Sequence, residues 1–534
     1  MTGIYKKFKS GTDIRGIGIG NGDEPLYMSD EFISKASAAF ADFLSEKTGK
    51  ATDKLTVAIG HDPRLSAGRI SAAVVRGLAL RGVNIIDCSL SSTPAMFMAV
   101  LDLPCDGSVQ MTASHHPGDR NGLKFFTVDG GLDSPDIAYI LEKAEDIELG
   151  DAPIKITACD HMKQYAAHLR SLICKGIGAD ESDKPLAGMR IMVDAGNGAG
   201  GFYASEVLAP LGADVSPSMN LEPDGNFPVY VPNPESSVMI DSAAERVKQT
   251  NADFGIVFDT DVDRAGAVLP SDGGVIALDR NRLIALMAAI LVRQYGPITV
   301  VTDSITSTGL TDFINSLGCR HHRFKRGYRN VINEAKRLLA LEEAAKKAKE
   351  ETDAEFANAI LADAEFANAI FANAIFAMET SGHGALRENY FLDDGAYIIV
   401  KLLVALVEAR REGKTLNELI ANLKEPCESA EARLNVLLDD TADYTAAVLE
   451  TVEKHFSNLP GFEIVQPNYE GVRVNADETH GNGWFLVRRS LHDPLMPCNI
   501  ESNSVGGMRL IAAELYNALR AFDKLELEPL KKLM

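Results

Sequence analysis

The stretch LTVAIGHDPRLSAGRISAAVVRGLAL (residues 55–80) contains the features that decide the fold. Residues 55–59 form a short apolar run typical of a buried strand, residues 60–68 form a polar loop with glycine, and residues 69–80 place apolar side chains at helical spacing. The same order recurs at 191–211, around DAGNGAGG, and at 299–317, around DSITSTG. The sequence therefore predicts three related, doubly wound α/β domains in series, with ligand sites in loops at the carboxyl ends of the strands.

The last hundred residues show a different pattern. Short strand candidates lie in RLNVLLDD, GFEIVQ, GVRVNAD and GWFLVRRS, around a helix expected from Thr441 to His455. This pattern predicts a smaller α+β domain at the C-terminus. The expected boundaries give four domains, at 1–170, 171–297, 298–425 and 426–534. Within the third, the Ala-rich residues 342–377, which repeat FANAI at 356, 366 and 371, predict a helical insertion.

Composition narrows the classes of partner. The chain has 53 Lys and Arg against 75 Asp and Glu, a formal net charge of −22, which argues against nucleic-acid binding through general basicity. The first residues, MTGIYKKFKSG, lack the apolar core of a signal peptide, and apolar runs such as 283–292 are too short to span a bilayer. We therefore expect a cytoplasmic protein with neither a nucleic-acid nor a membrane partner.

The first candidate for chemistry is the segment TASHHP (residues 112–117). Ser114 is followed by His115 and His116, and Lys124 lies ten residues beyond it. A serine near imidazoles and a cation could act as a nucleophile in phosphoryl chemistry. A polar turn is the alternative, and a zinc site on the two histidines is disfavoured because adjacent side chains of a strand point to opposite faces.

The second candidate is the segment DTDVDR (residues 259–264), directly after the apolar run 255–258. Asp259, Asp261 and Asp263 must converge on a divalent cation or repel one another, so the spacing favours a hard-metal site over a solvated acidic turn. An EF-hand is excluded because Arg264 and Pro270 stand where it needs Gly and Glu. A haloacid-dehalogenase-type enzyme would use Asp259 as its nucleophile, but its motif has no counterpart of Asp263 followed by Arg264.

A third glycine-rich segment, DAGNGAGG (residues 194–201), invites a nucleotide-binding interpretation. It has neither the Lys-Ser/Thr ending of a phosphate-binding loop nor the acidic residue and spacing of a dinucleotide fingerprint. The sequence therefore favours a backbone turn between a strand and a helix.

The serine loop (residues 112–117) and the aspartate loop (residues 259–264) together resemble those of the α-D-phosphohexomutases, the phosphoglucomutase/phosphomannomutase family. TASHHP with Lys124 is similar to the family's T-A/G-S-H-N-P loop, and DTDVDR to its D-G-D-x-D-R loop. ETSGH (residues 379–383) resembles the E-x-S-G-H sugar loop, and SGTDIRG (10–16) and GHDPRLS (60–66) resemble two further family segments. The resemblance extends across the chain and implies four domains around a central cleft.

The resemblance also implies a mechanism. Ser114 would carry a phosphoryl group, exchange it with a hexose phosphate through a hexose 1,6-bisphosphate, and be activated by that bisphosphate. Mg²⁺ would be held by the phosphate on Ser114 and by Asp259, Asp261 and Asp263. Lys124 would be the general acid/base. Arg15 and His115 would lie close by, and Arg264 would steady the metal loop or the phosphoserine.

Substrate recognition follows from the same resemblance. It implies contacts to hexose phosphate from Arg264, Arg329, Glu379, Ser381, His383, Arg488, Ser490 and His492. Arg329 replaces a Lys of the family, and RRSLHD (residues 488–493) departs from its R-x-S-G-T-E phosphate loop through Leu491 and His492. Arg488 and Ser490 retain the charge and the hydroxyl of that loop.

Glucose and mannose phosphates are the expected substrates, with monomer or homodimer as the expected state. Three alternatives remain at this point. They are a phosphoglucosamine mutase, a haloacid-dehalogenase-type phosphatase and a catalytically silent protein that binds sugar phosphates.

In a phosphohexomutase the four expected domains would, in order, carry the phosphoserine loop, bind the metal, recognise the sugar and bind the phosphate.

Overall fold

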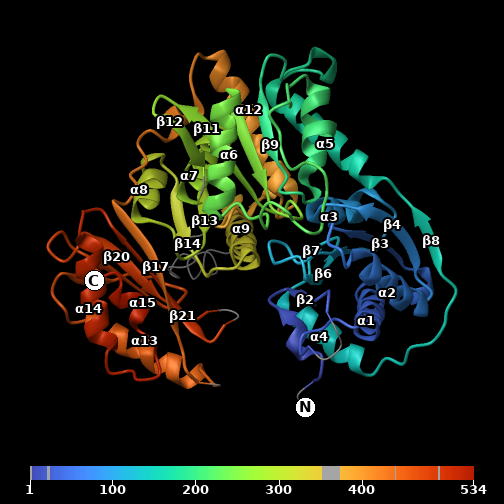
Figure 1. Ribbon diagram of the computed structural model, residues 1–534, viewed down its shortest axis with the longest axis horizontal. Coiled ribbons are helices and arrows are strands. Elements are labelled where there is room, and N and C mark those ends of the chain that lie inside the picture. Colours follow the sequence, from blue (N-terminus) through green and yellow to red (C-terminus); the bar gives the residue numbers. More distant parts are fainter. Residues whose placement is uncertain (1–2, 21–23, 279, 351–372, 439, 491–492) are drawn as a thin grey trace. The chain divides into compact units, whose positions relative to one another are not determined.

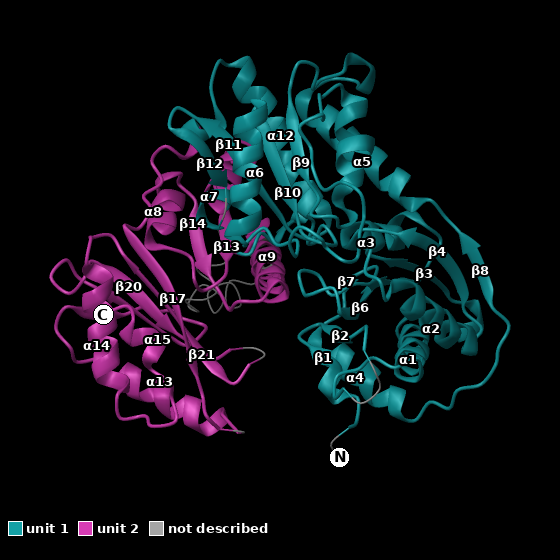
Figure 2. Ribbon diagram, in the orientation of Figure 1, with its two compact units in different colours: residues 1–283, 381–418 teal, residues 284–380, 419–534 magenta. Residues whose placement is uncertain are grey.

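The computed structural model describes residues 3–20, 24–278, 280–350, 373–438, 440–490 and 493–534. The chain divides into two compact units, drawn in teal and magenta in Figure 2. Unit 1 contains residues 1–283 and 381–418, and unit 2 contains residues 284–380 and 419–534. α7 (Arg280–Tyr295) crosses the boundary between them.

The first sheet of unit 1 has the strand order β1-β2-β6-β5-β3-β4-β8, with β7 paired to β6 (Figure 1). β3, β4, β5 and β8 are mutually parallel, and β1, β2, β6 and β7 pair in antiparallel fashion. The strands are β1 (Lys9–Ser10), β2 (Asp13–Ile17), β3 (Thr56–His61), β4 (Asn84–Leu90), β5 (Gly107–Met111), β6 (Arg120–Thr127), β7 (Gly130–Gly131) and β8 (Lys155–Ala158).

Helices cover both faces of this sheet. α1 (Asp30–Thr48), α2 (Ala67–Leu80) and α4 (Ser134–Glu145) share one apolar core with Val109 and Met111 of β5. The alternate residue of β5, Ser108, donates to the carbonyl of Met96 in α3 (Thr93–Asp102) at 2.5 Å. Because successive strand residues point to opposite faces, α3 covers the other side. The predicted double winding is confirmed here.

The second sheet of unit 1 has the order β12-β11-β10-β9. β9 (Ile191–Asp194) and β10 (Phe254–Phe258) are parallel, whereas β11 (Ala265–Ser271) and β12 (Gly274–Leu278) continue in antiparallel fashion. α6 (Ser237–Thr250) packs on it through Met239, Ala243 and Val247. The helix expected up to Leu211 is present but irregular. Residues 199–211 are helical without interruption, and their hydrogen bonding changes between 3-10 and π turns at 199–201, 203–208 and 209–211.

Within unit 2, three strands of the third sheet pair in parallel fashion. β13 (Thr299–Thr302) pairs with β14 (Arg320–Arg323) on one side and β15 (Phe376–Met378) on the other, with α8 (Thr308–Ser316) and α9 (Tyr328–Glu350) beside them. The helical insertion expected at 342–377 is wrong at its end, since 376–378 is a strand whose side chains are all buried. Its start belongs to α9, and residues 351–372 lie outside the described part of the chain.

The C-terminal sheet of unit 2 is antiparallel, with the order β17-β21-β20-β19-β18. Its core combines these strands with α13 and α14. The elements are β17 (Glu428–Asn435), β18 (Phe462–Ile464), β19 (Val472–Ala476), β20 (Gly483–Val487), β21 (Leu495–Ser502), α13 (Ala442–Phe456), α14 (Gly507–Leu519) and the short α15 (Glu528–Lys531). The expected α+β domain is confirmed, although β21 and α14 had not been predicted.

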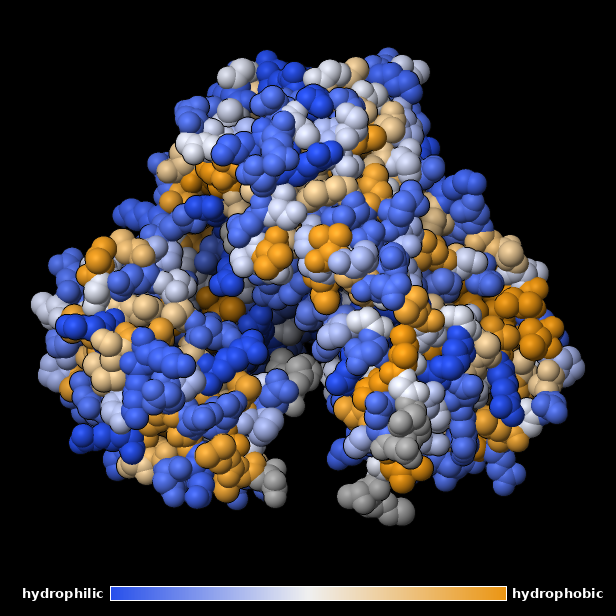
Figure 3. All heavy atoms as spheres, viewed as in Figure 1, coloured by the Kyte–Doolittle hydropathy of each residue, from blue (hydrophilic) through white to orange (hydrophobic). Residues whose placement is uncertain are grey.

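The surface is mixed in character. Figure 3 shows hydrophilic side chains over much of the visible face, with apolar ones interspersed. Among the described residues, no helix combines the length and the apolar character needed to cross a membrane.

The remaining helices of unit 1, α5 (His161–Ile177) and α12 (Gly395–Arg411), are joined by a buried hydrogen bond. The hydroxyl of Tyr165 donates to Asp394 Oδ1 at 2.8 Å, and the same carboxyl caps α12 by accepting from the amide of Tyr397 at 2.9 Å. Burial raises the pKa of Asp394 to about 6. One carboxyl therefore fixes both the start of α12 and its contact with α5.

The short strand β16 (Gly384–Leu386) precedes α12 in the chain.

We predict that Tyr165→Phe lowers the free energy of unfolding by about 1 to 2 kcal/mol, because a buried carboxyl loses one of its donors. The measurement is thermal unfolding followed by circular dichroism. The matched control is Tyr139→Phe, whose hydroxyl donates to Glu46 at an exposed position. An equal, negligible shift in both variants would show that the Tyr165 hydrogen bond does not hold α12.

Candidate active site

Ser114 lies in the turn between β5 and β6 of unit 1 and is buried. Its backbone has φ of 51°, a left-handed conformation that is uncommon for a non-glycine residue. Ser114 Oγ donates to Asp259 Oδ2 at 3.1 Å and accepts from Arg264 Nη2 at 2.7 Å. The structure thus brings the predicted nucleophile together with the predicted metal loop and its arginine.

The metal loop is the turn between β10 and β11. Asp259, Asp261 and Asp263 are all buried and offer oxygens that lie within 4.8 Å of one another. Between them, Val262 has φ of 67°, which is strained for a β-branched residue. Along an extended strand these alternate positions would share one face but be spread out along it, and the tight turn brings their carboxylates together.

The electrostatics of this loop fit a divalent cation. Burial, together with the charges of Asp263 and Asp261, raises the pKa of Asp259 well above its usual value. Burial opposes ionisation of Asp263 as well, but Lys124, His383 and Arg264 outweigh it and hold that pKa well below its usual value. Among the described residues, Asp261 Oδ1 has no hydrogen-bond partner. A buried carboxylate oxygen that has no hydrogen-bond partner and lies among other carboxylates is suited to be a ligand of a hard metal ion.

Lys124 reaches the same loop from β6. Its ammonium donates to Asp261 Oδ2 at 3.0 Å and also to Asp263. Thr93, the first residue of α3, donates its hydroxyl to Asp261 Oδ2 at 2.5 Å and its amide to the Asp261 carbonyl at 2.8 Å. Thr93 was not predicted, since an isolated threonine at a helix start carries no signal of its own in the sequence.

His115 and Arg15 also lie at this site. His115 Nδ1 is 3.4 Å from Ser114 Oγ and contacts the Arg264 guanidinium, and burial and the Arg264 charge lower its pKa. Arg15 pairs with Asp13 and approaches the Ala113 carbonyl at 3.5 Å. The rings of His115 and His116 are 5.0 Å apart, but neither belongs to a described group that could hold a metal, so the zinc alternative gains no support.

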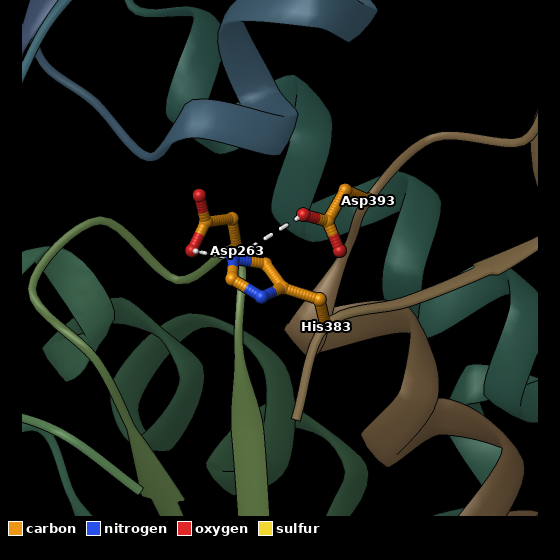
Figure 4. Close-up of side chains that lie close together, drawn as sticks. All are labelled: Asp263, His383 and Asp393. Carbon is orange, nitrogen blue, oxygen red and sulfur yellow. Dashed lines mark ion pairs between the residues drawn. The ribbon is translucent and has the colours of Figure 1, made fainter. Parts of the chain in front are cut away.

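His383 joins the site from the segment that returns to unit 1. Figure 4 shows its ring between Asp263 and Asp393, and Nε2 lies 3.6 Å from a carboxylate oxygen of each. Burial lowers the pKa of His383, and its Nδ1 is 2.8 Å from Ser381 Oγ. Gly382 between them has φ of 94°, and an added Cβ would lie 2.8 Å from the Ala265 carbonyl. Asp393, which lies ten residues after His383, was not predicted as part of the site.

The other predicted substrate residues belong to unit 2. Glu379 Oε1 accepts from the amide of Gly327 at 2.6 Å, and Arg329 lies in the first turn of α9. Arg488 follows β20, is buried, and has Nη1 4.0 Å from Glu470. Ser490 Oγ accepts from the amide of Asp493 at 3.2 Å. His492 lies outside the described residues.

Glu470 connects these segments within unit 2 and had not been predicted. Besides its proximity to Arg488, its Oε2 accepts from Ser304 Oγ at 2.5 Å and from the amide of Arg326 at 3.1 Å. The loop that follows β13, the loop that holds Glu379 and the segment that carries Arg488 are therefore linked through one carboxylate.

The glycine-rich turn DAGNGAGG packs against the metal loop. The amide of Ala199 donates to the Thr260 carbonyl at 2.8 Å, and a Cβ on Gly198 would lie 2.7 Å from that carbonyl oxygen. The glycine is therefore explained by a close backbone contact, as a structural turn requires.

Comparison with known proteins agrees with this geometry. Models of the phosphoglucomutase/phosphomannomutase α/β/α domains I, II and III match residues 6–150, 163–273 and 279–426. The chain belongs to the phosphoglucomutase/phosphomannomutase family. It is therefore a phosphohexomutase, an isomerase that transfers a phosphoryl group, and the predicted fold of three α/β domains followed by a smaller sheet domain is confirmed. The family match supports a phosphohexomutase over the haloacid-dehalogenase and silent-binder alternatives.

Several relatives of this phosphohexomutase match over most of their length. The phosphomannomutase/phosphoglucomutase of Pseudomonas aeruginosa is 27% identical over 468 residues, 88% of each chain. The phosphoglucomutase of Neisseria gonorrhoeae is 27% identical over 519 residues, 96% of each chain. A probable phosphoglucosamine mutase of Methanopyrus kandleri is 25% identical over 497 residues, 92% of this chain and 95% of that one.

The fold matches a solved structure as well. A family protein of Burkholderia thailandensis superposes with a TM-score of 0.72 and 22% identity, covering 96% of this chain and 97% of that one. At this identity the match supports the fold alone.

We predict that Asp261→Asn weakens metal binding by at least about tenfold and lowers the turnover rate with it, since one charged ligand is lost from the cluster. Titration of Mn²⁺ by calorimetry and of activity by Mg²⁺ measures both effects. Asp272→Asn, an exposed aspartate in the turn between β11 and β12, is the control. Unchanged Mn²⁺ affinity in Asp261→Asn would remove this residue from the metal site.

Proposed function

We propose that this phosphohexomutase interconverts hexose 1-phosphate and hexose 6-phosphate of glucose, mannose or both, through a phosphoserine at Ser114 and a hexose 1,6-bisphosphate. The observation that carries the proposal is the direct contact of Ser114 Oγ with Asp259 and Arg264. A serine oxygen held between a metal-loop carboxylate and a guanidinium is suited to carry a phosphoryl group, whose charge both a cation and an arginine can offset.

In the proposed reaction, the bond between phosphorus and Ser114 Oγ breaks as the phosphoryl group passes to a free hexose hydroxyl. The hexose 1,6-bisphosphate then reorients so that its other phosphate faces Ser114. Ser114 Oγ attacks that phosphate and recovers a phosphoryl group. Lys124 takes up and returns the hydroxyl proton as general acid/base, and its contacts to Asp261 and Asp263 support that position. Arg15 and His115 assist at the same loop, since Arg15 lies 3.5 Å from the Ala113 carbonyl and His115 Nδ1 lies 3.4 Å from Ser114 Oγ.

Asp259, Asp261 and Asp263 would hold the Mg²⁺, together with a phosphate oxygen on Ser114. When bound, the ion supplies electrostatic stabilisation of the transferring phosphoryl group. Arg264 donates to Ser114 and Asp259 at once, so it holds the two loops in register. Hexose 1,6-bisphosphate serves as activator, because it can load an unphosphorylated Ser114.

For substrate recognition we assign the sugar hydroxyls to Glu379, Ser381 and His383, and the second phosphate to a set of cationic and polar side chains: Arg329, Arg488, Ser490 and His492. The network through Glu470, Ser304 and Arg326 supports placing Arg488 near the loop that holds Glu379. Glucosamine phosphate is the alternative substrate, favoured by the 25% identity to the probable phosphoglucosamine mutase.

The remaining features of the proposal follow from the sequence. The boundaries at 170, 297 and 425 separate the phosphoserine, metal, sugar and phosphate domains. The protein works in the cytoplasm on small-molecule hexose phosphates, as a monomer or homodimer, with neither a nucleic-acid nor a membrane partner.

The test is incubation with glucose 1,6-bisphosphate and Mg²⁺, followed by peptide mass spectrometry. We expect phosphate on Ser114, and we expect Ser114→Ala to lower the mutase rate more than about 1,000-fold, because the group that carries the phosphoryl is removed. Coupled assays with glucose, mannose and glucosamine phosphates then identify the sugar.

The control for this substitution is Ser457→Ala, an exposed serine after α13 whose hydroxyl donates only within its own helix turn. Full activity in Ser114→Ala, or phosphate on Asp259 in place of Ser114, would overturn the proposed mechanism.

A further inference from the structure

Arg64 is a fully buried arginine that lies directly behind the Ser114 loop. Its Nη2 donates to the carbonyls of Ser114 at 2.5 Å and His116 at 2.7 Å, and its Nη1 donates to those of Pro117 at 2.5 Å and Arg120 at 3.0 Å. Its Nε donates to Asp62 Oδ2 at 3.0 Å. A guanidinium has five N–H donors, and here each of them meets an oxygen.

Three of the four carbonyls, those of Ser114, His116 and Pro117, belong to the loop at residues 112–119, and the fourth belongs to Arg120, the first residue of β6. The loop lies outside the ladder of the sheet, so its carbonyls need partners beyond the strand pairing. Asp62, which holds Arg64, also accepts from the hydroxyl of Thr112 at 2.7 Å, and that hydroxyl accepts from the amide of Ser114 at 2.9 Å. Arg64 and Asp62 thus fix the loop through both its carbonyls and its Ser114 amide.

A second segment closes around the same arginine. The ring of Phe227 lies 5.4 Å from the Arg64 guanidinium carbon, and Phe227 itself has φ of 47°. A Cβ on Gly225 would lie 2.3 Å from the Pro63 carbonyl, and a Cβ on Gly118 would lie 2.9 Å from the Gly225 carbonyl. Segment 224–227 therefore packs tightly on both Arg64 and the Ser114 loop.

Segment 224–227 also leads to the metal loop. The amide of Asp224 donates to the Asn197 carbonyl at 2.9 Å, and the turn that contains Asn197 contacts Thr260 through Gly198 and Ala199. The scaffold behind Ser114 and the scaffold behind Asp259 are thus one continuous set of contacts within unit 1.

We propose that Arg64 is a positioning residue that holds Ser114 in the conformation that presents its Oγ to Asp259 and Arg264, with Phe227 and Gly225 closing its far side. The inference rests on the proposed role of Ser114 as phosphoryl carrier. A φ of 51° costs free energy and persists only where surrounding contacts over-determine it. The four carbonyl contacts of Arg64, with Asp62 and Thr112, supply that constraint.

The role requires an arginine in particular. Lysine offers three donors on one nitrogen, so it cannot reach four separated carbonyls and a carboxylate at once. Arg64→Lys keeps the positive charge but cannot supply donors to all of the carbonyls at once. The variant therefore tests geometry separately from charge.

The experiment compares Arg64→Lys with the wild type in steady-state mutase kinetics and in the single-turnover transfer of phosphate from glucose 1,6-bisphosphate to Ser114. We expect both rates to fall on the order of 100-fold, the cost of misplacing a reacting group by about 1 Å. We expect KM to change less than about threefold, since Arg64 is buried behind the loop and does not face the substrate. Arg81→Lys, which replaces an arginine paired with Asp42 away from the site, is the matched control.

Arg64→Lys rates within twofold of the wild type would overturn the inference, as would an equal loss in Arg81→Lys. If Arg64→Lys does not fold, Phe227→Leu keeps the arginine and removes only the ring over it. A lower transfer rate at unchanged KM then supports the inference, and wild-type behaviour contradicts it. Wild-type protein without phosphate on Ser114 would instead refute the proposed function, so the two failures are distinguishable.

Discussion

The burial of three carboxylates within one turn of chain is the constraint on which unit 1 depends. Asp259, Asp261 and Asp263 are withdrawn from water and lie close enough to repel one another strongly. Arg264 offsets part of this from the same turn, and Lys124 and His383 bring positive charge or donors from distant segments. A divalent cation held by the same oxygens would offset the remaining negative charge. Metal binding would therefore also stabilise the folded conformation of this loop.

That balance also explains why the reacting serine lies where it does. Lys124 is on β6, and the turn between β5 and β6 therefore has to lie over the end of β10. Ser114 sits in this turn and meets Asp259 and Arg264 directly. The Arg64 network then fixes the turn from behind, and Thr93 fixes Asp261 through the start of α3. Each loop of the site is thus held by a group from another loop.

Unit 2 has its own network around the substrate residues. Glu470 reaches Ser304, Arg326 and Arg488, and the neighbouring Gly327 holds Glu379. Arg473 adds a second link, since it donates to the carbonyls of Ser304 and Thr306 while its guanidinium lies 3.6 Å from the centre of the Trp484 ring. The parallel sheet and the C-terminal sheet of unit 2 are therefore joined through buried polar contacts, which demand defined geometry.

The sequence by itself determined the strand, loop and helix order of the α/β domains, because hydrophobic periodicity and glycine-rich turns are local properties. It also determined the likeness of the serine loop and the aspartate loop to those of a known family. Each of these motifs lies within one short stretch of sequence, so its spacing can be read directly. It did not reveal β21, α14, or the change between 3-10 and π turns within the helical run at 199–211. Only the tertiary structure decided that Arg64, Thr93 and Asp393 support the site, because their partners lie far along the chain and a hydrogen bond between distant segments leaves no mark on local sequence.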